Sequence, residues 1–576
     1  MKHLLNYLMF VLLAMSFVGC QKDNIVLIDP VEADDAEDDI ENTVFTQTVF
    51  VTFSESGDAS VTGADDNFTV TINGNDVTLV YSGDEYVMYE LSGGTTDGFF
   101  KLYSPRKQAI TLNSVYLVNP NGAALNVQGT LSEPNKGKRT FIVLNGTNDL
   151  ADGTSYTDTP SSEDEKGAMF GEGQFIFSGS GRLYVTATGK NGIVSDDYLS
   201  FKSGEVQVTS SAGHGIRGKD CIRVSGGDIQ VNVSADMKKG FSTDGYVVID
   251  GGLTSINVTG GTAYDSEDGE YTGSAGIKAD GYFRMNGGGL TIVNTGTGGK
   301  GISCDGNGYF NGGQVEVYAK GSNYGNSGGG GFPPGGGGSS SSDGVAAKGI
   351  KCDGNLIFAG GTVYANSINH EAIEAKGSIT ITDGVVYGNS QSDDAINSGG
   401  DLTISGGRVF GASSGNDGID SNGDCYIKGG LVFAIGSSSP EVAIDANTEG
   451  GYKLYLTGGT LIAIGGLEQG SSLTQSCYQA SSWTAETWYV MTVGTKTYAF
   501  FTPTSTNSRA LVVSGESTPT LKSGVSVTGG TSWFANLFFE NADISGGTAV
   551  SLSSYTGGGG GGPGGGGGPG GGGGPF

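Results

Sequence analysis

Short runs of alternating apolar and polar residues fill the chain from about residue 45 to residue 470. Gly-Gly or Asp-Gly pairs separate these runs, and residues that favour helices are scarce among them. Successive side chains of a strand point to opposite faces, so such alternation predicts β-strands with one buried side. We therefore predict an all-β fold.

The runs recur with a period near 23 residues, and each repeat carries one apolar anchor. Most neighbouring anchors are 23 or 25 residues apart, and the wider gaps hold insertions such as the Gly-rich stretch 322–344. One coil cannot bury its own apolar face, whereas stacked coils can. The pattern predicts a right-handed parallel β-helix, a solenoid of ~23-residue coils with a C-terminal β cap. The anchors are Ile193, Ile216, Phe241, Ile277, Ile302, Ile350, Ile373, Ile396, Ile419 and Ile444.

The period fails after Gly470, and the segment that follows contains all three tryptophans. Solenoid ends need a cap over the exposed core and sheet edge, and this segment is the candidate. The predicted regions are a lipoprotein signal peptide (1–20), an acidic disordered tether (21–44), the parallel β-helix (45–470), a C-terminal capping β region (471–555) and a Gly/Pro tail (556–576).

The first 20 residues, MKHLLNYLMFVLLAMSFVGC, have a basic start, a short apolar run and small residues before a cysteine. This is typical of a secretory signal. The ending FVGC resembles the lipobox of bacterial lipoproteins, which predicts acylation of Cys20 and a membrane anchor. An ordinary signal with a chance cysteine is the alternative. The nine acids and one base of residues 21–44 resemble surface-export signals of Bacteroidetes-type lipoproteins, so we expect an outer-membrane, cell-surface location.

The net charge of −30 argues against nucleic acid as a partner, because phosphates attract lysine and arginine. It leaves room for cation binding and, through bound cations, for anionic partners. The five cysteines after Cys20 form no CxxC pair, and the chain has only three histidines, which disfavours zinc. We expect a monomer.

Acidic residues recur beside the anchors of the last regular coils. In a stack they form columns whose carboxylates, ~4.8 Å apart, repel by ~0.9 kcal/mol per pair even in water. Ca²⁺ takes 6–8 oxygens at 2.3–2.6 Å, so opposite ligands lie ~4.6–5.2 Å apart, which matches the strand spacing. The columns predict structural calcium; solvated turn acids are the alternative. The candidate ligands are Glu371, Glu374, Asp393, Asp394, Asn397, Asp417, Asp420 and Asp445.

A second column predicts a sugar-binding strip. Val363, Val386, Val409, Val432 and Leu461 alternate with small residues and should point inward. The intervening Tyr364, Tyr387, Phe410 and Phe433 would then face outward, as a platform on which sugar rings stack. The alternative is that a loop or the C-terminal cap covers them. Cys304 and Cys352 stack at a narrow inward position, and their disulfide state stays open.

The coils GI-x-x-x-[DG]…GG-x-V, the segment LNGTNDLADG (144–153) and the corners DDAIN and NDGID carry a family resemblance. Over roughly residues 45–550 the chain resembles secreted bacterial calcium-binding parallel β-helix proteins that bind carbohydrate and share the pectate-lyase fold. The resemblance implies binding of plant-type polysaccharides, including acidic pectin-like chains, without catalysis. The Gly-rich insertion and the tail depart from the family pattern.

Three functions compete. The leading hypothesis is a surface-anchored polysaccharide-binding protein with structural calcium. The second is a calcium-dependent polysaccharide lyase, in which Lys348, Lys351 or Lys376 removes a proton before β-elimination. A single histidine at a turn, His370, is expected to be a polar surface residue rather than a catalyst. The third hypothesis is an adhesin or surface scaffold that needs no glycan.

Overall fold

The computed structural model describes residues 35–157, 159–325, 344–480, 482–504 and 510–557. The predicted signal peptide with Cys20, the interior of the Gly-rich insertion and most of the tail lie outside these residues. The chain divides into two compact units, Met1–Asp39 and Ile40–Phe576. The described part of the first contains a short 3-10 helix, η1 (Ala36–Asp38), capped by Asp35.

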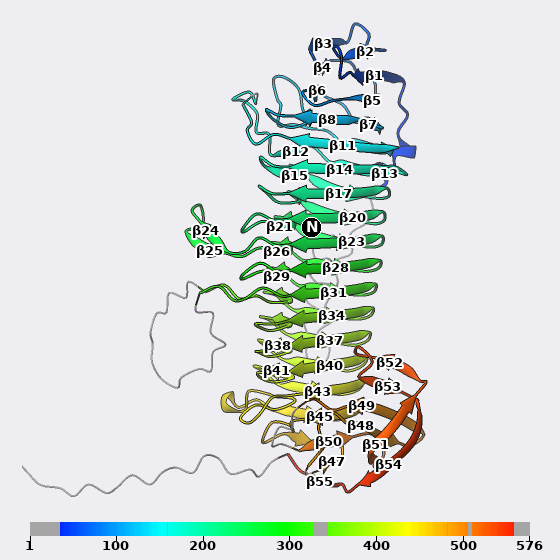
Figure 1. Cartoon of the computed structure of the whole chain (residues 1–576), viewed down its shortest axis with the longest axis vertical. Coiled ribbons are helices and arrows are strands. Elements are labelled where there is room, and N and C mark those ends of the chain that lie inside the picture. The colour runs from blue at the N-terminus through cyan, green and yellow to red at the C-terminus, as the bar shows by residue number, and fades with distance from the viewer. Residues whose placement is uncertain (1–34, 158, 326–343, 481, 505–509, 558–576) are drawn as a thin grey trace, which may run out of the picture. The chain divides into compact units, whose positions relative to one another are not determined.

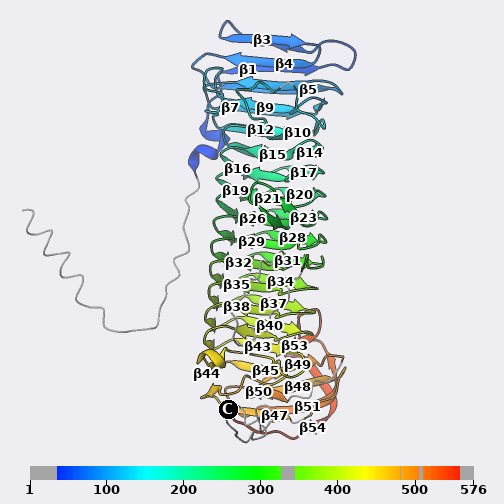
Figure 2. The same cartoon turned by 90° about the vertical axis from the view of Figure 1, so that its left-hand side faces the viewer.

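Most strands of the second unit belong to three long ladders, which we call A, B and C (Figures 1 and 2). Each repeat adds one strand to each ladder, and that strand pairs in parallel with its equivalent in the next repeat. In the B ladder, for example, Ile373 pairs with Ile396, and Ile396 with Ile419. The 23-residue register predicted from the anchors is therefore the register of the sheets.

The bounds of the strands follow ladder by ladder. The A ladder contains β1 (Gln47–Phe53), β5 (Val87–Thr95), β7 (Gln108–Asn113), β10 (Thr140–Asn145), β13 (Phe175–Gly179), β16 (Tyr198–Phe201), β19 (Cys221–Val224), β22 (Tyr246–Ile249), β27 (Phe283–Met285), β30 (Gly308–Phe310), β33 (Leu356–Phe358), β36 (Ile379–Ile381), β39 (Leu402–Ile404), β42 (Cys425–Ile427), β44 (Leu454–Leu456) and β46 (Ser472–Leu473). The B ladder contains β3 (Phe68–Asn73), β4 (Asp76–Tyr81), β6 (Phe99–Tyr103), β9 (Leu125–Gln128), β12 (Gly167–Gly171), β15 (Asn191–Ser195), β18 (Ile216–Gly218), β21 (Lys239–Thr243), β26 (Ala275–Ala279), β29 (Lys300–Cys304), β32 (Ile350–Cys352), β35 (Ile373–Ala375), β38 (Ile396–Ser398) and β41 (Ile419–Ser421). The C ladder contains β8 (Tyr116–Asn119), β11 (Thr147–Asp152), β14 (Arg182–Ala187), β17 (Glu205–Ser210), β20 (Asp228–Val233), β23 (Leu253–Val258), β28 (Gly289–Asn294), β31 (Gln314–Ala319), β34 (Thr362–Ser367), β37 (Val385–Ser390), β40 (Arg408–Ser413), β43 (Leu431–Ile435) and β45 (Thr460–Ile464).

Between the ladders lies one continuous apolar core. All ten anchors are fully buried, and so are the predicted inward valines and Leu461. Burying a side chain of this size contributes about 1.5–3 kcal/mol, so the stack is stabilised coil by coil. A disulfide joins Cys304 to Cys352 on consecutive strands of the B ladder, with Cα atoms 4.7 Å apart.

Glycine makes the tight turn from each A strand to the following C strand. The second turn residue has a positive φ, for example +72° at Gly407, +80° at Gly430 and +90° at Gly459. Residues with a Cβ rarely adopt this conformation, which explains why glycine holds the second turn position in each coil from Gly204 to Gly459.

The C-terminal region ends the parallel pairing and adds a separate sheet. Strand β50 (Leu511–Ser514) pairs antiparallel with β45, so the last C strand has no free edge. A six-stranded antiparallel sheet, ordered β52-β53-β49-β48-β51-β54, lies beside the lowest coils (Figure 1). The remaining strands are β2 (Ser60–Thr62), β24 (Ala263–Asp265), β25 (Glu270–Thr272), β47 (Cys477–Ala480), β48 (Trp488–Val493), β49 (Lys496–Phe501), β51 (Thr520–Thr528), β52 (Thr531–Trp533), β53 (Phe538–Glu540), β54 (Asp543–Val550) and β55 (Ser553–Tyr555).

The predicted disordered tether, residues 21–44, is too long at its C-terminal end. Residues Ile40–Asn42 form the 3-10 helix η2, and Ile40 packs with Phe45 against Phe141 on the outside of the A ladder. Burial of these two apolar side chains orders a segment whose acidic composition suggested disorder. The other 3-10 helix of the second unit is η3 (Thr448–Gly450). Among the described residues, no helix is long and apolar enough to cross a membrane.

Candidate functional site

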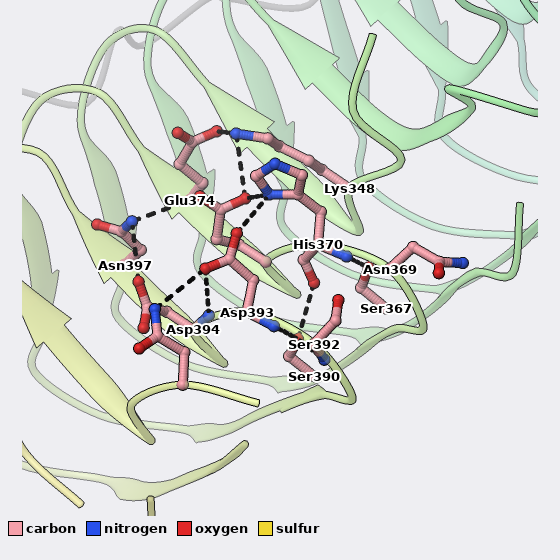
Figure 3. Close-up of polar contacts among 12 residues, drawn as sticks. Lys348, Ser367, Asn369, His370, Glu374, Ser390, Ser392, Asp393, Asp394 and Asn397 are labelled. Carbon is pink, nitrogen blue, oxygen red and sulfur yellow. Dashed lines mark hydrogen bonds and ion pairs between the residues drawn. The ribbon is translucent and has the colours of Figure 1, made fainter. Parts of the chain in front are cut away.

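Buried serines fix the loops that lead from each C strand into the next B strand. The Ser390 hydroxyl donates to His370 O (2.9 Å) and accepts from Asp393 N (3.0 Å). One coil later, Ser413 donates to Asp393 O (2.6 Å) and accepts from Asn416 N (2.9 Å). Each loop is thus bonded to the equivalent loop of the preceding coil, and the acids that the loops carry are held in register (Figure 3).

The predicted ligands nearer the N-terminus belong to an ion-paired group. We call it the paired cluster; it contains Lys348, His370, Glu371, Glu374 and Asp393. Lys348 Nζ lies 2.5 Å from Glu374 Oε2 and 3.1 Å from Glu371 Oε2. His370 Nδ1 lies 2.9 Å from Asp393 Oδ2 and also contacts Glu371 (Figure 3). All five side chains are buried, so two basic groups compensate three carboxylates inside the protein.

The directions of the pKa shifts agree with this pairing. Burial alone would lower the pKa of His370, but hydrogen bonds to Asp393 and Glu371 outweigh it and raise the pKa to about 9. Burial opposes ionisation of Glu371 and Asp393, yet the His370 contacts hold the pKa of both carboxyls below its usual range. His370, Glu371 and Asp393 are therefore charged near neutral pH, and with the Lys376 ammonium on Glu374 the three carboxylates meet three basic groups.

The lower acids form a second group, the aspartate cluster: Asp394, Asp417, Asp420 and Asp445. Carboxylate oxygens of the last three lie within 4.8 Å of one another. Backbone N–H groups donate to Asp394 Oδ1 (from Asp417, 3.1 Å) and to Asp417 (from Val442). Among the described residues, none of the four carboxylates is paired with a lysine, arginine or histidine.

Burial without a basic partner raises the pKa of these carboxyl groups. Burial raises the pKa of Asp417 to about 8 and that of Asp420 to about 6. Burial, followed by a hydrogen bond with Glu468, raises the pKa of Asp445 to about 10. Burial and the charges of Asp420 and Asp417 raise the pKa of Asp394 well above its usual range. Such a site needs protons or a cation, and an all-oxygen donor set at this spacing fits Ca²⁺.

The structure thus divides the eight predicted ligands. Glu371, Glu374 and Asp393 belong to the paired cluster, while Asp394, Asp417, Asp420 and Asp445 form the aspartate cluster. Asn397 lies between the two, and its Nδ2 is 3.3 Å from Asp394 Oδ2 and 3.5 Å from Glu371 Oε1. The expectation that His370 is a surface residue is wrong: its side chain is buried because two carboxylates accept from it.

The predicted sugar platform faces outward from the coils, as expected, but it is not open. Phe410 and Phe433 are fully buried, Tyr387 is 8% exposed and Tyr364 is half-buried. The C-terminal sheet covers them: Phe534 stacks on Phe410 (4.6 Å between ring centroids), and Phe433 contacts Phe500 and Phe538. The prediction of an exposed platform is therefore wrong, and these rings stabilise the junction between the two sheets.

Comparison with known proteins identifies the family. The sequence profile of the carbohydrate-binding domain-containing proteins matches residues 73–267 and 230–395, more than half of the chain. The chain belongs to this family. Among curated proteins, none matches. One solved structure is similar, that of a polysaccharide lyase-like protein from C. thermocellum (gadolinium derivative), with a TM-score of 0.37 and 20% identity over 47% of this chain and 100% of that one.

Carboxylates pair with all three lysines that were predicted as bases. Lys348 is paired with Glu371 and Glu374, Lys376 with Glu374, and Lys351 with Asp353. Carboxylates beside an ammonium stabilise its charged form, and the pKa of Lys348 is raised accordingly.

Two lysines that the sequence reasoning missed, Lys239 and Lys300, lie higher on the B ladder. Burial and neighbouring ammonium groups lower the pKa of each to about 8. Both stand two residues before an anchor, the register position of Glu371, Asp394 and Asp417. Comparing the residue two positions before the anchor in the earlier coils would have identified both lysines.

Proposed function

We propose that this protein is a non-catalytic, surface-anchored polysaccharide-binding protein whose coils form a right-handed parallel β-helix with a C-terminal β cap. The observation that supports this proposal is the match of residues 73–395 to the carbohydrate-binding domain family. A long stack of parallel coils offers an extended, rigid surface, which suits a polymeric ligand better than a small one. We expect the protein to act as a monomer.

Calcium is the proposed cofactor, and the aspartate cluster is the part of the chain that suits it. Asp394, Asp417, Asp420 and Asp445 would supply oxygen ligands to an ion that compensates their buried charge. The ion would hold three consecutive coils together. The paired cluster needs no ion, because Lys348, His370 and Lys376 pair with its three carboxylates.

The proposed location is the outer membrane surface, with a lipid on Cys20 and the acidic segment after it as spacer. The proposed ligands are plant-type glycans, above all acidic, pectin-like chains. Retention of the full chain on a panel of insoluble polysaccharides, with calcium and with chelator, tests both ideas. We expect retention on pectin-type material; failure to bind any plant, host or microbial glycan would favour the scaffold hypothesis.

A calcium-dependent lyase is the second candidate function. The observation that favours it is the lowered pKa of Lys300. Its pKa of about 8 leaves part of the amine neutral, and no described residue forms an ion pair with it. Such an amine could take the C5 proton of a uronate while the 4-linked sugar leaves and a C4–C5 double bond forms. Incubation with polygalacturonate and calcium, followed by ultraviolet absorbance of the unsaturated product, tests this activity. Product formed by the wild type but not by Lys300→Met would establish the lyase. No product from the wild type would contradict it.

A further inference from the structure

A groove lies between the A-to-C turns of the lowest coils and the six-stranded C-terminal sheet. Its volume is about 640 Å³, within the range of about 300–1,000 Å³ typical of ligand sites. It is separate from both acid clusters, because these lie on the opposite side of each coil, at the C-to-B loops and the B ladder.

The floor of the groove is glycine. A Cβ on Gly429 would lie 2.4 Å from Ser405 O, and one on Gly458 would lie 2.5 Å from Lys428 O, so no side chain can replace the hydrogens. A column of such turns leaves the backbone uncovered by side chains in consecutive coils, so a chain-like ligand can approach the backbone closely. The glycines that line the groove are Gly407, Gly429, Gly430, Gly458 and Gly459.

The walls carry exposed positive charge in a protein whose net charge is −30. Lys428 and Lys496 line the groove, are exposed, and form no ion pair with any described residue. Arg408 on the same wall pairs with Glu540 and lies 4.6 Å from the Trp533 ring centroid. Glu516 is the other acid of the wall, so two free ammonium groups face one free carboxylate.

A half-exposed aromatic pair continues the groove onto the outer face of the A ladder. The Tyr426 and Tyr455 rings stack with centroids 5.0 Å apart and planes 12° from parallel. Lys428 Nζ lies 4.8 Å from the Tyr426 centroid, so the pair adjoins the cationic wall. Tyr426 and Lys428 are two residues apart, as are Tyr455 and the groove-lining Thr457, and each pair faces the same way.

From this juxtaposition we propose that the groove and the Tyr426–Tyr455 pair bind one linear acidic polysaccharide. This inference rests on the proposed function, takes the acidic glycan class from it, and names where the glycan lies and which residues recognise it. Uronate carboxylates are recognised by Lys428 and Lys496, and the apolar faces of sugar rings pack on the tyrosines. Binding here involves none of the proposed calcium ligands.

Affinity electrophoresis of the full chain through gels containing polygalacturonate tests the assignment. Charge reversal at two wall positions, Lys428→Glu with Lys496→Glu, is expected to weaken binding by roughly tenfold or more at low salt. Tyr426→Ala with Tyr455→Ala is expected to weaken it by about tenfold with little salt dependence. The matched control is Lys522→Glu, an exposed lysine on β51 outside the groove, which should bind like the wild type.

The melting temperature shows whether the Lys428→Glu, Lys496→Glu protein is folded. If it is unfolded, Lys428→Gln with Lys496→Gln replaces it in the binding test. Wild-type retardation together with unchanged retardation of both double variants overturns the assignment but leaves polysaccharide binding intact. Retardation only by a neutral glycan overturns the acidic ligand class. A wild type that binds no polysaccharide overturns the proposed function itself and this assignment with it.

Discussion

The paired cluster and the aspartate cluster use the same register positions of consecutive coils, yet they neutralise charge in different ways. In the upper one, Lys348 and His370 compensate three buried carboxylates. In the lower one, four carboxylates meet without a described basic partner, and their pKa values rise. The repeat therefore supplies the acid column, and the residues beside it decide whether that column is a structural ion pair or a cation site.

The largest expected effect breaks the paired cluster. Lys348→Met keeps the aliphatic stem but removes the buried ammonium that Glu371 and Glu374 share, and should lower the free energy of unfolding by about 3–5 kcal/mol. Lys376→Met is the matched control: its exposed side chain pairs with the same Glu374, and its loss should cost under about 1 kcal/mol. Denaturant titration with and without chelator measures both; a Lys348→Met cost that appears only with chelator would contradict the comparison.

Metal removal should affect the aspartate cluster alone. A ligand present at about 100 times its Kd stabilises the folded state by about 2.7 kcal/mol, so chelation should lower the melting temperature by several degrees. Asp394→Ala with Asp417→Ala should abolish this sensitivity, whereas Lys348→Met should retain it. Calorimetry checks both; a wild-type melt that chelator leaves unchanged would argue against structural calcium.

Without calcium, the aspartate cluster should make stability fall as pH rises. The pKa of Asp417 is raised to about 8 in the folded state, so the folded protein binds more protons than the unfolded chain between about pH 4 and pH 8. The stabilisation is complete below the unfolded pKa and is lost as pH rises through about 8. In chelated protein, Asp417 should contribute about 2 kcal/mol of the loss between pH 6 and pH 8. Asp417→Asn should therefore make the slope shallower, and the raised pKa of Asp445 keeps the remainder. Calcium should suppress the slope in the wild type.

The smallest expected effect concerns His370. Its pKa is raised to about 9, so its contribution is complete below the unfolded value near 6.5 and is lost as pH rises through about 9. This shift corresponds to about 2–3 kcal/mol at pH 7. Glutamine keeps one donor for the carboxylates, so His370→Gln should remove about 1–2 kcal/mol at pH 7 and nothing at pH 10, with or without calcium. Urea titrations at the two pH values compare the variants; a calcium-dependent His370 effect would show that the clusters are not independent.

Much of the fold could be predicted because the repeat imposes it. Ile396 and its equivalents are buried anchors in the predicted register, and Val386 points inward as its alternation with small residues requires. The candidate site was harder. Phe410 faces outward as predicted, but its cover, Phe534, lies more than 100 residues later in a segment without the repeat. Lys348, which compensates Glu371, lies just after the Gly-rich insertion, where the interrupted coil pattern resumes.

The disulfide between Cys304 and Cys352 encloses that interruption. Both ends of the insertion are held, since Ile302 pairs with Ile350 and Tyr324 with Val345. Lengthening a segment between fixed ends costs little, about 0.6 kcal/mol per doubling. Tyr324 and Val345 thus bracket an insertion point: a foreign sequence placed between them, such as an epitope or a second binding module, should leave the register of the coils on either side unchanged.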